Sequence, residues 1–195
     1  PREDLVSTLV QAHAADGRLT RDELVVGLVF LAFAGMETTR NQLTLAVRTL
    51  LRHPDQLAKL RANKQLLDNT VMEVLRFDFG QGGGLPRYAL RDFELREKRI
   101  RKGQMIMLSI GGANYDPAVF EDPDVLDLDR SVRDLLTFGN GPHYCIGAPL
   151  ARLEAEIALA AILQRCTHLE LVDAQPPFRH HTSQRNPTRL PIAFG

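Results

Sequence analysis

A long helix-forming stretch near the start of the chain constrains the fold more than any other feature. Thr20 and Glu23 stand three residues apart, which is the capping-box pattern of a helix start. Pro54 ends the stretch, so the sequence predicts one helix from about Arg21 to Arg52. Its segment Leu24–Ala34 is so apolar that the helix needs neighbours on nearly every side.

The remaining pattern predicts a mainly α fold with minor β. Helical spacing and flanking breakers predict further helices over 4–14, 54–62, 66–77 and 149–165. Glycines from Gly80 onward and Pro86 break any helix. Short strands are predicted after this break, over 93–95, 99–101, 105–110, 169–172 and 190–194, with turns at 97–98 and 102–103.

Charge and cysteine content exclude several functional classes. Lys plus Arg and Asp plus Glu both number 24, so broad electrostatic capture of nucleic acid or anionic membrane is disfavoured. The longest apolar run, 24–36, is interrupted by Gly27 and is shorter than the ~20 residues that cross a bilayer. Cys145 and Cys166 are too few for a disulfide framework. We therefore expect a cytoplasmic protein with reduced thiols and no membrane span.

The segment 138–147 is the most informative motif. Its three glycines and one proline make a rigid loop that can pass close to a flat ligand. Cys145 ends the loop just before a helix whose first turn carries Pro149. A thiol there lies near the helix dipole and unpaired N–H groups, both of which favour the thiolate. The alternative is a buried small hydrophobe, which is the usual fate of a lone cysteine.

Two further motifs carry polar residues on helices. Glu73 and Arg76 share one helix face, and alone they indicate an exposed ion pair worth ~0–1 kcal/mol. Gly35 interrupts the long helix at a cost of about 1 kcal/mol relative to Ala. Thr38 can bond back to the carbonyl of Ala34, and the loosened turn can hold a small molecule and water. The alternative is a kink with a polar side chain turned to solvent.

Together these segments resemble the cytochrome P450 family. Phe-x-x-Gly-x-His-x-Cys-x-Gly over 138–147 matches the family's haem-binding loop at every defined position. Glu73-x-x-Arg76 matches its buried Glu-x-x-Arg helix, and Ala-Gly-x-Glu-Thr-Thr over 34–39 matches its oxygen-activation motif. The three motifs also follow one another in the family's order.

The resemblance implies a haem b cofactor with Cys145 as the axial thiolate. His143 and Arg87 are expected to pair with the haem propionates, and Phe138 to pack beside the thiolate. Gly139 and Gly147 are expected to shape the cofactor-binding loop. On the proximal surface, Arg152 is expected to meet an electron donor, although a solvated helix charge is an equally good interpretation.

The resemblance also assigns the oxygen side and the scaffold. Thr38 and Glu37 are expected to stabilise bound oxygen and relay protons to it. Glu73 and Arg76 are expected to form a buried network with Arg130, which serves assembly of the site rather than chemistry. The expected substrate pocket consists of Phe30, Ala34, Gly83, Leu85 and Gln184. One departure is Tyr115, where bacterial relatives commonly carry Arg, and it suggests altered local pairing.

The implied activity is that of a haem-thiolate monooxygenase. It inserts one oxygen atom from O2 into an organic substrate by hydroxylation or epoxidation, with a polyketide or another secondary metabolite as the expected substrate. Nothing in the chain resembles a flavin or iron–sulfur domain, so a ferredoxin-type donor with its reductase is implied. The alternatives are a peroxide-using or non-oxygenating haem-thiolate protein and a non-catalytic haem-binding fragment.

The resemblance covers all 195 residues but only the C-terminal part of a single family domain. The N-terminal part of the domain, with much of the distal helical cover, is absent by this comparison. We therefore expect residues 1–195 alone to be inactive and not to hold haem in a closed pocket.

Overall fold

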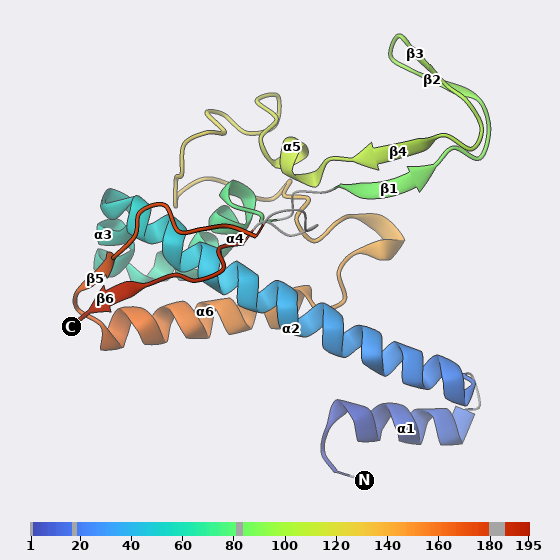
Figure 1. The fold of residues 1–195 in the computed structure, drawn as a ribbon, viewed down its shortest axis with the longest axis horizontal. Helices are drawn as coiled ribbons and strands as arrows, with labels where there is room; N and C mark the ends of the chain where they lie inside the picture. Colours follow the sequence, from blue (N-terminus) through green and yellow to red (C-terminus); the bar gives the residue numbers. More distant parts are fainter. Residues whose placement is uncertain (1, 17–18, 81–83, 180–185) are drawn as a thin grey trace. The chain divides into compact units, whose positions relative to one another are not determined.

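The computed structural model describes residues 2–16, 19–80, 84–179 and 186–195 (Figure 1). The chain divides into two compact units, residues 1–40 and residues 41–195, which we describe separately. Helix α2 (Arg21–Arg52) contributes to both. No helix of the described ranges is long and apolar enough to cross a membrane.

The first unit consists of α1 (Leu5–Asp16) and the first turns of α2. The predicted capping box is confirmed. Thr20 N–H donates to the Glu23 carboxylate at 2.7 Å, and Glu23 N–H donates to Thr20 Oγ1 at 3.2 Å. The backbone hydrogen bond from Thr20 lowers the pKa of Glu23. The cap fixes the start of α2 at Arg21, and the helix runs to Arg52 as predicted.

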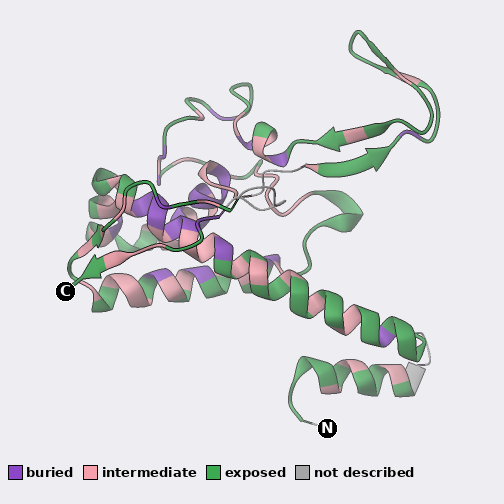
Figure 2. Cartoon of the chain, in the orientation of Figure 1, coloured by how far each residue is buried: buried purple, intermediate pink, exposed green. Residues whose placement is uncertain are grey.

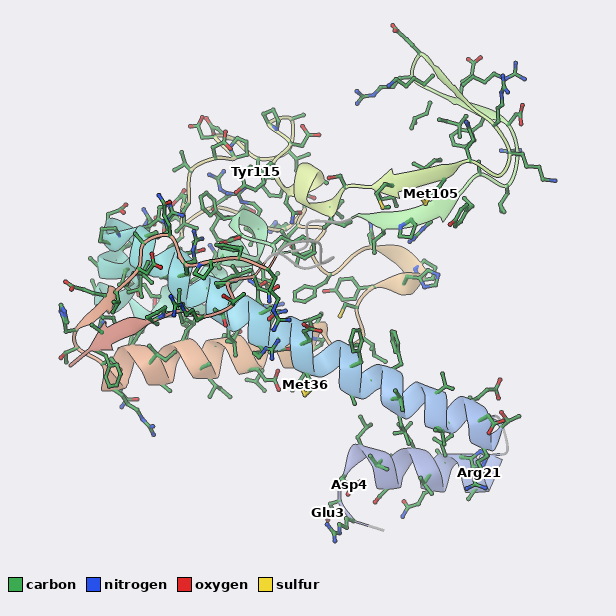
Figure 3. All side chains as sticks on the ribbon, in the orientation of Figure 1. Glu3, Asp4, Arg21, Met36, Met105 and Tyr115 are labelled. Atoms are coloured by element: carbon green, nitrogen blue, oxygen red, sulfur yellow. The ribbon has the colours of Figure 1, made fainter. Side chains whose placement is uncertain are left out.

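The first part of α2 exposes much of its apolar surface (Figure 2). Leu24 is buried, but Val29, Phe30, Phe33 and Met36 are exposed, the last by 74% of its surface (Figure 3). The described residues therefore leave most of this apolar stretch uncovered, and the expectation that it needs neighbours stays a prediction.

The second unit is built around a helical core. The later turns of α2 pack with α3 (Pro54–Ala62), α4 (Leu67–Phe77) and α6 (Ala148–Arg165), and a 3-10 turn over Lys64–Leu66 joins α3 to α4. The buried core comprises Ala46, Leu50, Leu60, Val71, Val74, Leu75, Leu126, Leu128, Ala155 and Leu159.

Arg61 joins the ends of α3 and α6. Its guanidinium donates to the carbonyl oxygens of Leu163 at 3.2 Å and Cys166 at 2.9 Å. The last carbonyls of a helix lack partners within it, so Arg61 caps α6 from a distant part of the sequence.

Among its described residues, the second unit also contains three two-stranded antiparallel sheets. In them β1 (Leu85–Tyr88) pairs with β4 (Met105–Leu108), β2 (Phe93–Leu95) with β3 (Lys98–Ile100), and β5 (Leu169–Leu171) with β6 (Ile192–Phe194). The first two sheets follow one another along one extended arm (Figure 1).

The structure corrects the strand predictions at three places. Strand β1 was not predicted, since Pro86 appeared to break the segment, but an edge strand tolerates proline. Lys98 begins β3 instead of belonging to a turn, and the chain turns at Arg96, whose φ is 55°. Ile110 starts a short helix, α5 (Ile110–Asn114), because Ser109 caps it by accepting the Gly112 N–H at 3.1 Å.

Candidate functional site

The loop before α6 owes its shape to two glycines. Gly139 and Gly141 both have φ of +76°, a conformation that other residues rarely adopt. Asn140 caps the turn over Gly141–His143 by accepting the Gly141 N–H at 2.7 Å. Cys145 N–H then donates to the Phe138 carbonyl at 2.8 Å, which closes the loop.

Cys145 lies at the entrance to α6 with an exposed, unpaired thiol. Its carbonyl accepts the Ala148 N–H at 3.2 Å, so the residue is tied to the first turn of the helix. The interpretation as a buried small hydrophobe is therefore wrong for Cys145. A Cβ at Gly147 would lie 3.9 Å from Cys145 Sγ, an ordinary contact, so the thiol itself does not require glycine there.

Phe138 anchors the loop in the core. Its partly buried side chain packs against the core cluster, and its ring lies 6.4 Å from that of Tyr144, tilted by 60°. Tyr144 itself is half exposed. The loop therefore has an apolar anchor at its start and an open end that carries Cys145.

A shallow hollow of about 260 Å³ lies beside the loop along α6. Its lining consists of Tyr144, Ala148, Pro149, Arg152, Leu153 and Glu156. Arg152 donates to Asp68 at 2.6 Å, and this hydrogen bond raises the pKa of Arg152. Burial and the nearby Asp68 charge raise the pKa of Glu156. Arg152 is thus partly exposed and paired with Asp68, and both interpretations of it stay open.

Glu73 and Arg76 form a fully buried, bidentate ion pair on α4. Arg76 Nε donates to Glu73 Oε2 at 2.7 Å and Nη2 to Oε1 at 2.9 Å. The remaining donors of Arg76 reach the carbonyl oxygens of Asn114, at the end of α5, and of Pro123 and Val125, at 2.8–3.2 Å. The pair is therefore buried and multiply bonded, not the exposed pair that spacing alone indicates.

The structure brings Arg130 to the same carboxylate. Arg130 Nε donates to Glu73 Oε1 at 3.2 Å, and Asp127 N–H donates to that oxygen at 3.1 Å. Arg130 also donates to the carbonyl oxygens of Glu121, Asp122 and Val125. One carboxylate thus holds two guanidinium groups and fixes the path of residues 121–130.

Asn114 was not predicted, yet it connects this network to the cysteine loop. Its carbonyl accepts from Arg76, and its buried side chain accepts the Leu136 N–H at 3.1 Å. Its amide also donates to Thr137 Oγ1 at 2.9 Å, and Thr137 in turn donates to the Leu75 carbonyl. The network therefore reaches the residue before Phe138.

Tyr115, the position where the sequence departs from the family pattern, contacts both α4 and its buried arginine. Its hydroxyl donates to the Phe77 carbonyl, and its ring lies 5.5 Å from the Arg76 guanidinium. Burial raises the pKa of Tyr115. The tyrosine therefore covers one face of the buried arginine and helps to end α4.

The Ala-Gly-x-Glu-Thr-Thr motif over 34–39 lies in the first unit. Thr38 Oγ1 donates to the Ala34 carbonyl, as predicted, and the Glu37 carboxylate lies 3.6 Å from the Arg40 guanidinium. A Cβ at Gly35 would have no heavy atom within 4 Å. Packing among the described residues therefore does not require this glycine.

The remaining predicted residues are dispersed. His143 lies in the turn before Cys145, and Arg87 lies on β1 with its guanidinium on the Pro86 carbonyl at 2.9 Å. Both are exposed. Of the predicted pocket, Phe30 and Ala34 lie on α2 and Leu85 on β1, while Gly83 and Gln184 lie outside the described residues. Within the described ranges, no group of three or more His, Cys, Asp or Glu is arranged to hold a metal ion.

Comparison with known proteins gives one consistent result. A family profile described as Cytochrome P450 matches residues 1–192. The chain is 40% identical over 194 residues to a biotin biosynthesis cytochrome P450 of Bacillus subtilis, covering 100% of this chain and 49% of the relative. It is 38% identical over 197 residues to mycinamicin IV hydroxylase/epoxidase of Micromonospora griseorubida, covering 100% and 50%.

Solved structures agree. The crystal structure of the LnmA cytochrome P450 hydroxylase, from the leinamycin biosynthetic pathway of Streptomyces atroolivaceus, matches with a TM-score of 0.90 at 43% identity. The match covers 99% of this chain and 50% of that chain. The chain thus spans about half the length of the relatives that it matches.

Proposed function

The chain belongs to the cytochrome P450 family, and on that premise we propose that it is the C-terminal part of a haem-thiolate monooxygenase domain spanning residues 1–195. The observation that carries the proposal is Cys145. Its thiol is exposed at the open end of a loop whose two left-handed glycines remove side chains from the surface beside it. A flat cofactor needs such a surface, so the residues present fit a haem.

Cys145 is the proposed axial ligand, and Phe138 and Gly139 shape the loop behind it. His143 and Arg87 are exposed donors suited to propionate carboxylates, with which charged donors make short hydrogen bonds. A haem with a cysteine thiolate ligand supplies oxygen activation, because the thiolate pushes electron density toward bound O2 and favours O–O cleavage. Gly147 completes the loop as the residue that precedes α6.

Thr38 and Glu37 are the proposed proton-handling residues. The Thr38 hydroxyl now donates to the Ala34 carbonyl, and its oxygen retains lone pairs that can accept a hydrogen bond. The Glu37 carboxylate is half-buried and lies 3.6 Å from the Arg40 guanidinium, one residue before Thr38 on the same helix. We assign no bond-forming role to either residue.

Glu73, Arg76 and Arg130 are proposed to assemble the site. Through Asn114 they fix residues 136–137, which lead directly into the cysteine loop. The network is remote from any reacting atom in this proposal, and its role is to hold the loop in place.

The proposed substrate is a polyketide or another secondary metabolite, hydroxylated or epoxidised in a cytoplasmic enzyme. Support comes from the similarity to mycinamicin IV hydroxylase/epoxidase and to LnmA. Phe30, Ala34, Gly83, Leu85 and Gln184 remain the proposed pocket residues. A ferredoxin-type donor with its reductase is the proposed electron source, and the hollow beside Arg152 is its proposed docking place.

The experiment is the absorption spectrum of the reduced carbon monoxide complex, which distinguishes thiolate from imidazole ligation. We expect a thiolate-type spectrum from the longest natural form of the protein, and its loss in Cys145→Ser. Cys166→Ser, which changes the other cysteine, is the matched control and should keep the spectrum. A thiolate spectrum that survives Cys145→Ser, or that is lost in Cys166→Ser, would overturn the assignment.

A second measurement tests whether residues 1–195 alone bind haem and oxidise a substrate. Residues 1–195 expressed alone should bind haem below one equivalent and show no turnover with a ferredoxin system. Stoichiometric binding with substrate oxidation would contradict this part of the proposal. Oxidation with peroxide but not with O2 and a ferredoxin system would instead favour the peroxide-using alternative.

A further inference from the structure

The hydroxyl of Thr137 joins the end of α4 to the start of the cysteine loop, residues 138–147. Thr137 Oγ1 donates to the Leu75 carbonyl at 3.0 Å and accepts from Asn114 Nδ2 at 2.9 Å. Leu75 lies two residues before the end of α4, where carbonyl oxygens lack partners within the helix. The hydroxyl therefore bonds to an acceptor that the helix leaves free.

The partners fix the direction of each of these hydrogen bonds. The Leu136 N–H can only donate, and the atom that accepts it, at 3.1 Å, is Asn114 Oδ1. The other end of this amide is an NH2 group, which can only donate to Thr137 Oγ1. Because the Leu75 carbonyl can only accept, the hydroxyl proton of Thr137 points to it. Turning the amide over would therefore leave the Leu136 N–H facing another donor.

The backbone connects Thr137 to Cys145 through two carbonyl groups. The Leu136 carbonyl accepts the Gly139 N–H at 2.8 Å, and the Phe138 carbonyl accepts the Cys145 N–H at 2.8 Å. Thr137 lies between these two residues in the chain. A change in the position of Thr137 would therefore displace both carbonyl groups to which the loop is bonded.

We propose that Thr137 is a positioning residue for the Cys145 ligand. Its hydroxyl fixes where the loop leaves the helical core, and so where the cysteine lies at the entrance to α6. Thr137 contacts no reacting atom in this role, and it acts through the backbone of the loop. The inference rests on the proposed function, because it takes Cys145 as the haem ligand.

The chain offers a matched control at Thr70 on α4. Thr70 is fully buried, and its hydroxyl has no hydrogen-bond partner within the described part of the chain. Thr137→Val and Thr70→Val make the same chemical change, but only the first leaves the Leu75 carbonyl and the Asn114 amide without a partner. Thr137→Ser keeps the hydroxyl and is the conservative variant. Thr137→Ala takes the place of Thr137→Val if the valine methyl group prevents folding.

The first arm of the test needs no haem and uses the longest natural form as isolated. Backbone amide exchange reports the loop through Cys145 N–H and the far end of α6 through Cys166 N–H, which donates to the Ile162 carbonyl at 2.9 Å. We expect Thr137→Val to speed exchange at Cys145 about tenfold, the equivalent of one lost hydrogen bond, and to leave Cys166 unchanged. Thr137→Ser should recover most of the difference, and Thr70→Val should speed neither rate.

The second arm uses the haem-loaded protein as its reduced carbon monoxide complex. The measured quantity is the rate at which the thiolate-type spectrum is lost, at a urea concentration that leaves the far-ultraviolet circular dichroism unchanged. We expect the loss to be severalfold faster in Thr137→Val, close to the unmodified rate in Thr137→Ser, and unchanged in Thr70→Val. A purely structural contact would not change this rate while the helices stay folded.

Each outcome supports or overturns one step. Unchanged exchange at Cys145 in Thr137→Val, or no recovery in Thr137→Ser, overturns the attachment of the loop by the hydroxyl. Equally faster exchange at Cys145 and Cys166 shows a general loss of stability and overturns the positioning role. Faster exchange at Cys145 with an unchanged rate of spectral loss overturns it too. Absence of the thiolate spectrum in the unmodified protein overturns the proposed function, and the exchange arm still decides whether Thr137 holds the loop.

Discussion

Replacement of Glu73 by Gln changes the shape of the side chain little, but it should lower the free energy of unfolding of the second unit strongly. The carboxylate accepts four hydrogen bonds, two from Arg76, one from Arg130 and one from the Asp127 N–H. Glutamine keeps one acceptor oxygen and places an NH2 group where the other oxygen was. That group faces a donor of Arg76, so at least one buried donor loses its partner.

The larger effect is electrostatic. Arg76 is fully buried and Arg130 is 10% exposed, so the substitution leaves two buried guanidinium groups without their carboxylate partner. Removing one partner of a buried pair costs about 3–5 kcal/mol. This range corresponds to roughly a hundredfold to several-thousandfold in the folding equilibrium constant.

The assay is urea unfolding of the longest natural form, followed by far-ultraviolet circular dichroism. The matched control is Asp68→Asn, the same chemical change at a carboxylate whose partner, Arg152, is half-buried and whose own side chain is 60% exposed. We expect a loss of about 0–1 kcal/mol in the control. A loss in Glu73→Gln no larger than in Asp68→Asn would refute the reasoning, because burial would then add nothing to the pair.

Three further outcomes are expected. Thr38→Ala should keep haem bound but divert electrons to peroxide or water, measured as product formed per reductant consumed; unchanged coupling would remove Thr38 from the mechanism. Tyr115→Phe removes the hydroxyl that donates to the Phe77 carbonyl and should cost about 1 kcal/mol in urea unfolding, with no loss if that carbonyl finds water instead. Burial and Asp68 raise the pKa of Glu156, so its contribution to stability is present below the unfolded pKa and is lost as pH rises through the folded value. Glu156→Gln should therefore stabilise the fold more at about pH 7 than at about pH 4, whereas Glu154→Gln at an exposed position should not; an equal effect at both pH values would contradict the assignment.

The sequence predicts best where the interacting residues are close along the chain. The capping box of Thr20 and Glu23 fixed the start of α2, and the shared face of Glu73 and Arg76 placed them together, because both pairs lie within one helical turn. The burial of the second pair was not visible from spacing, and only the resemblance indicated it.

The sequence predicts poorly where distant segments decide the outcome. Asn114 and Tyr115 acquire their roles from Arg76 and Phe77, which come much earlier in the chain. Ile110 fits a strand by its apolar character, but the Ser109 cap turns the chain into a helix there. Arg48 has the pattern of an ordinary helix charge, and only the structure shows that its guanidinium lies over the Phe178 ring.

The hydrogen bonds from Arg61 to the end of α6 have a consequence for the order of folding. They join residues separated by 102 and 105 positions, whereas the turn from α3 to α4 is local. Closing a long loop loses more chain entropy than closing a short one. We therefore expect α3 and α4 to associate early in folding and the hydrogen bonds from Arg61 to the end of α6 to form late. Contacts formed after the folding transition state govern the rate of unfolding rather than that of folding. We therefore expect loss of the Arg61 hydrogen bonds to speed unfolding of the helical core more than it slows folding.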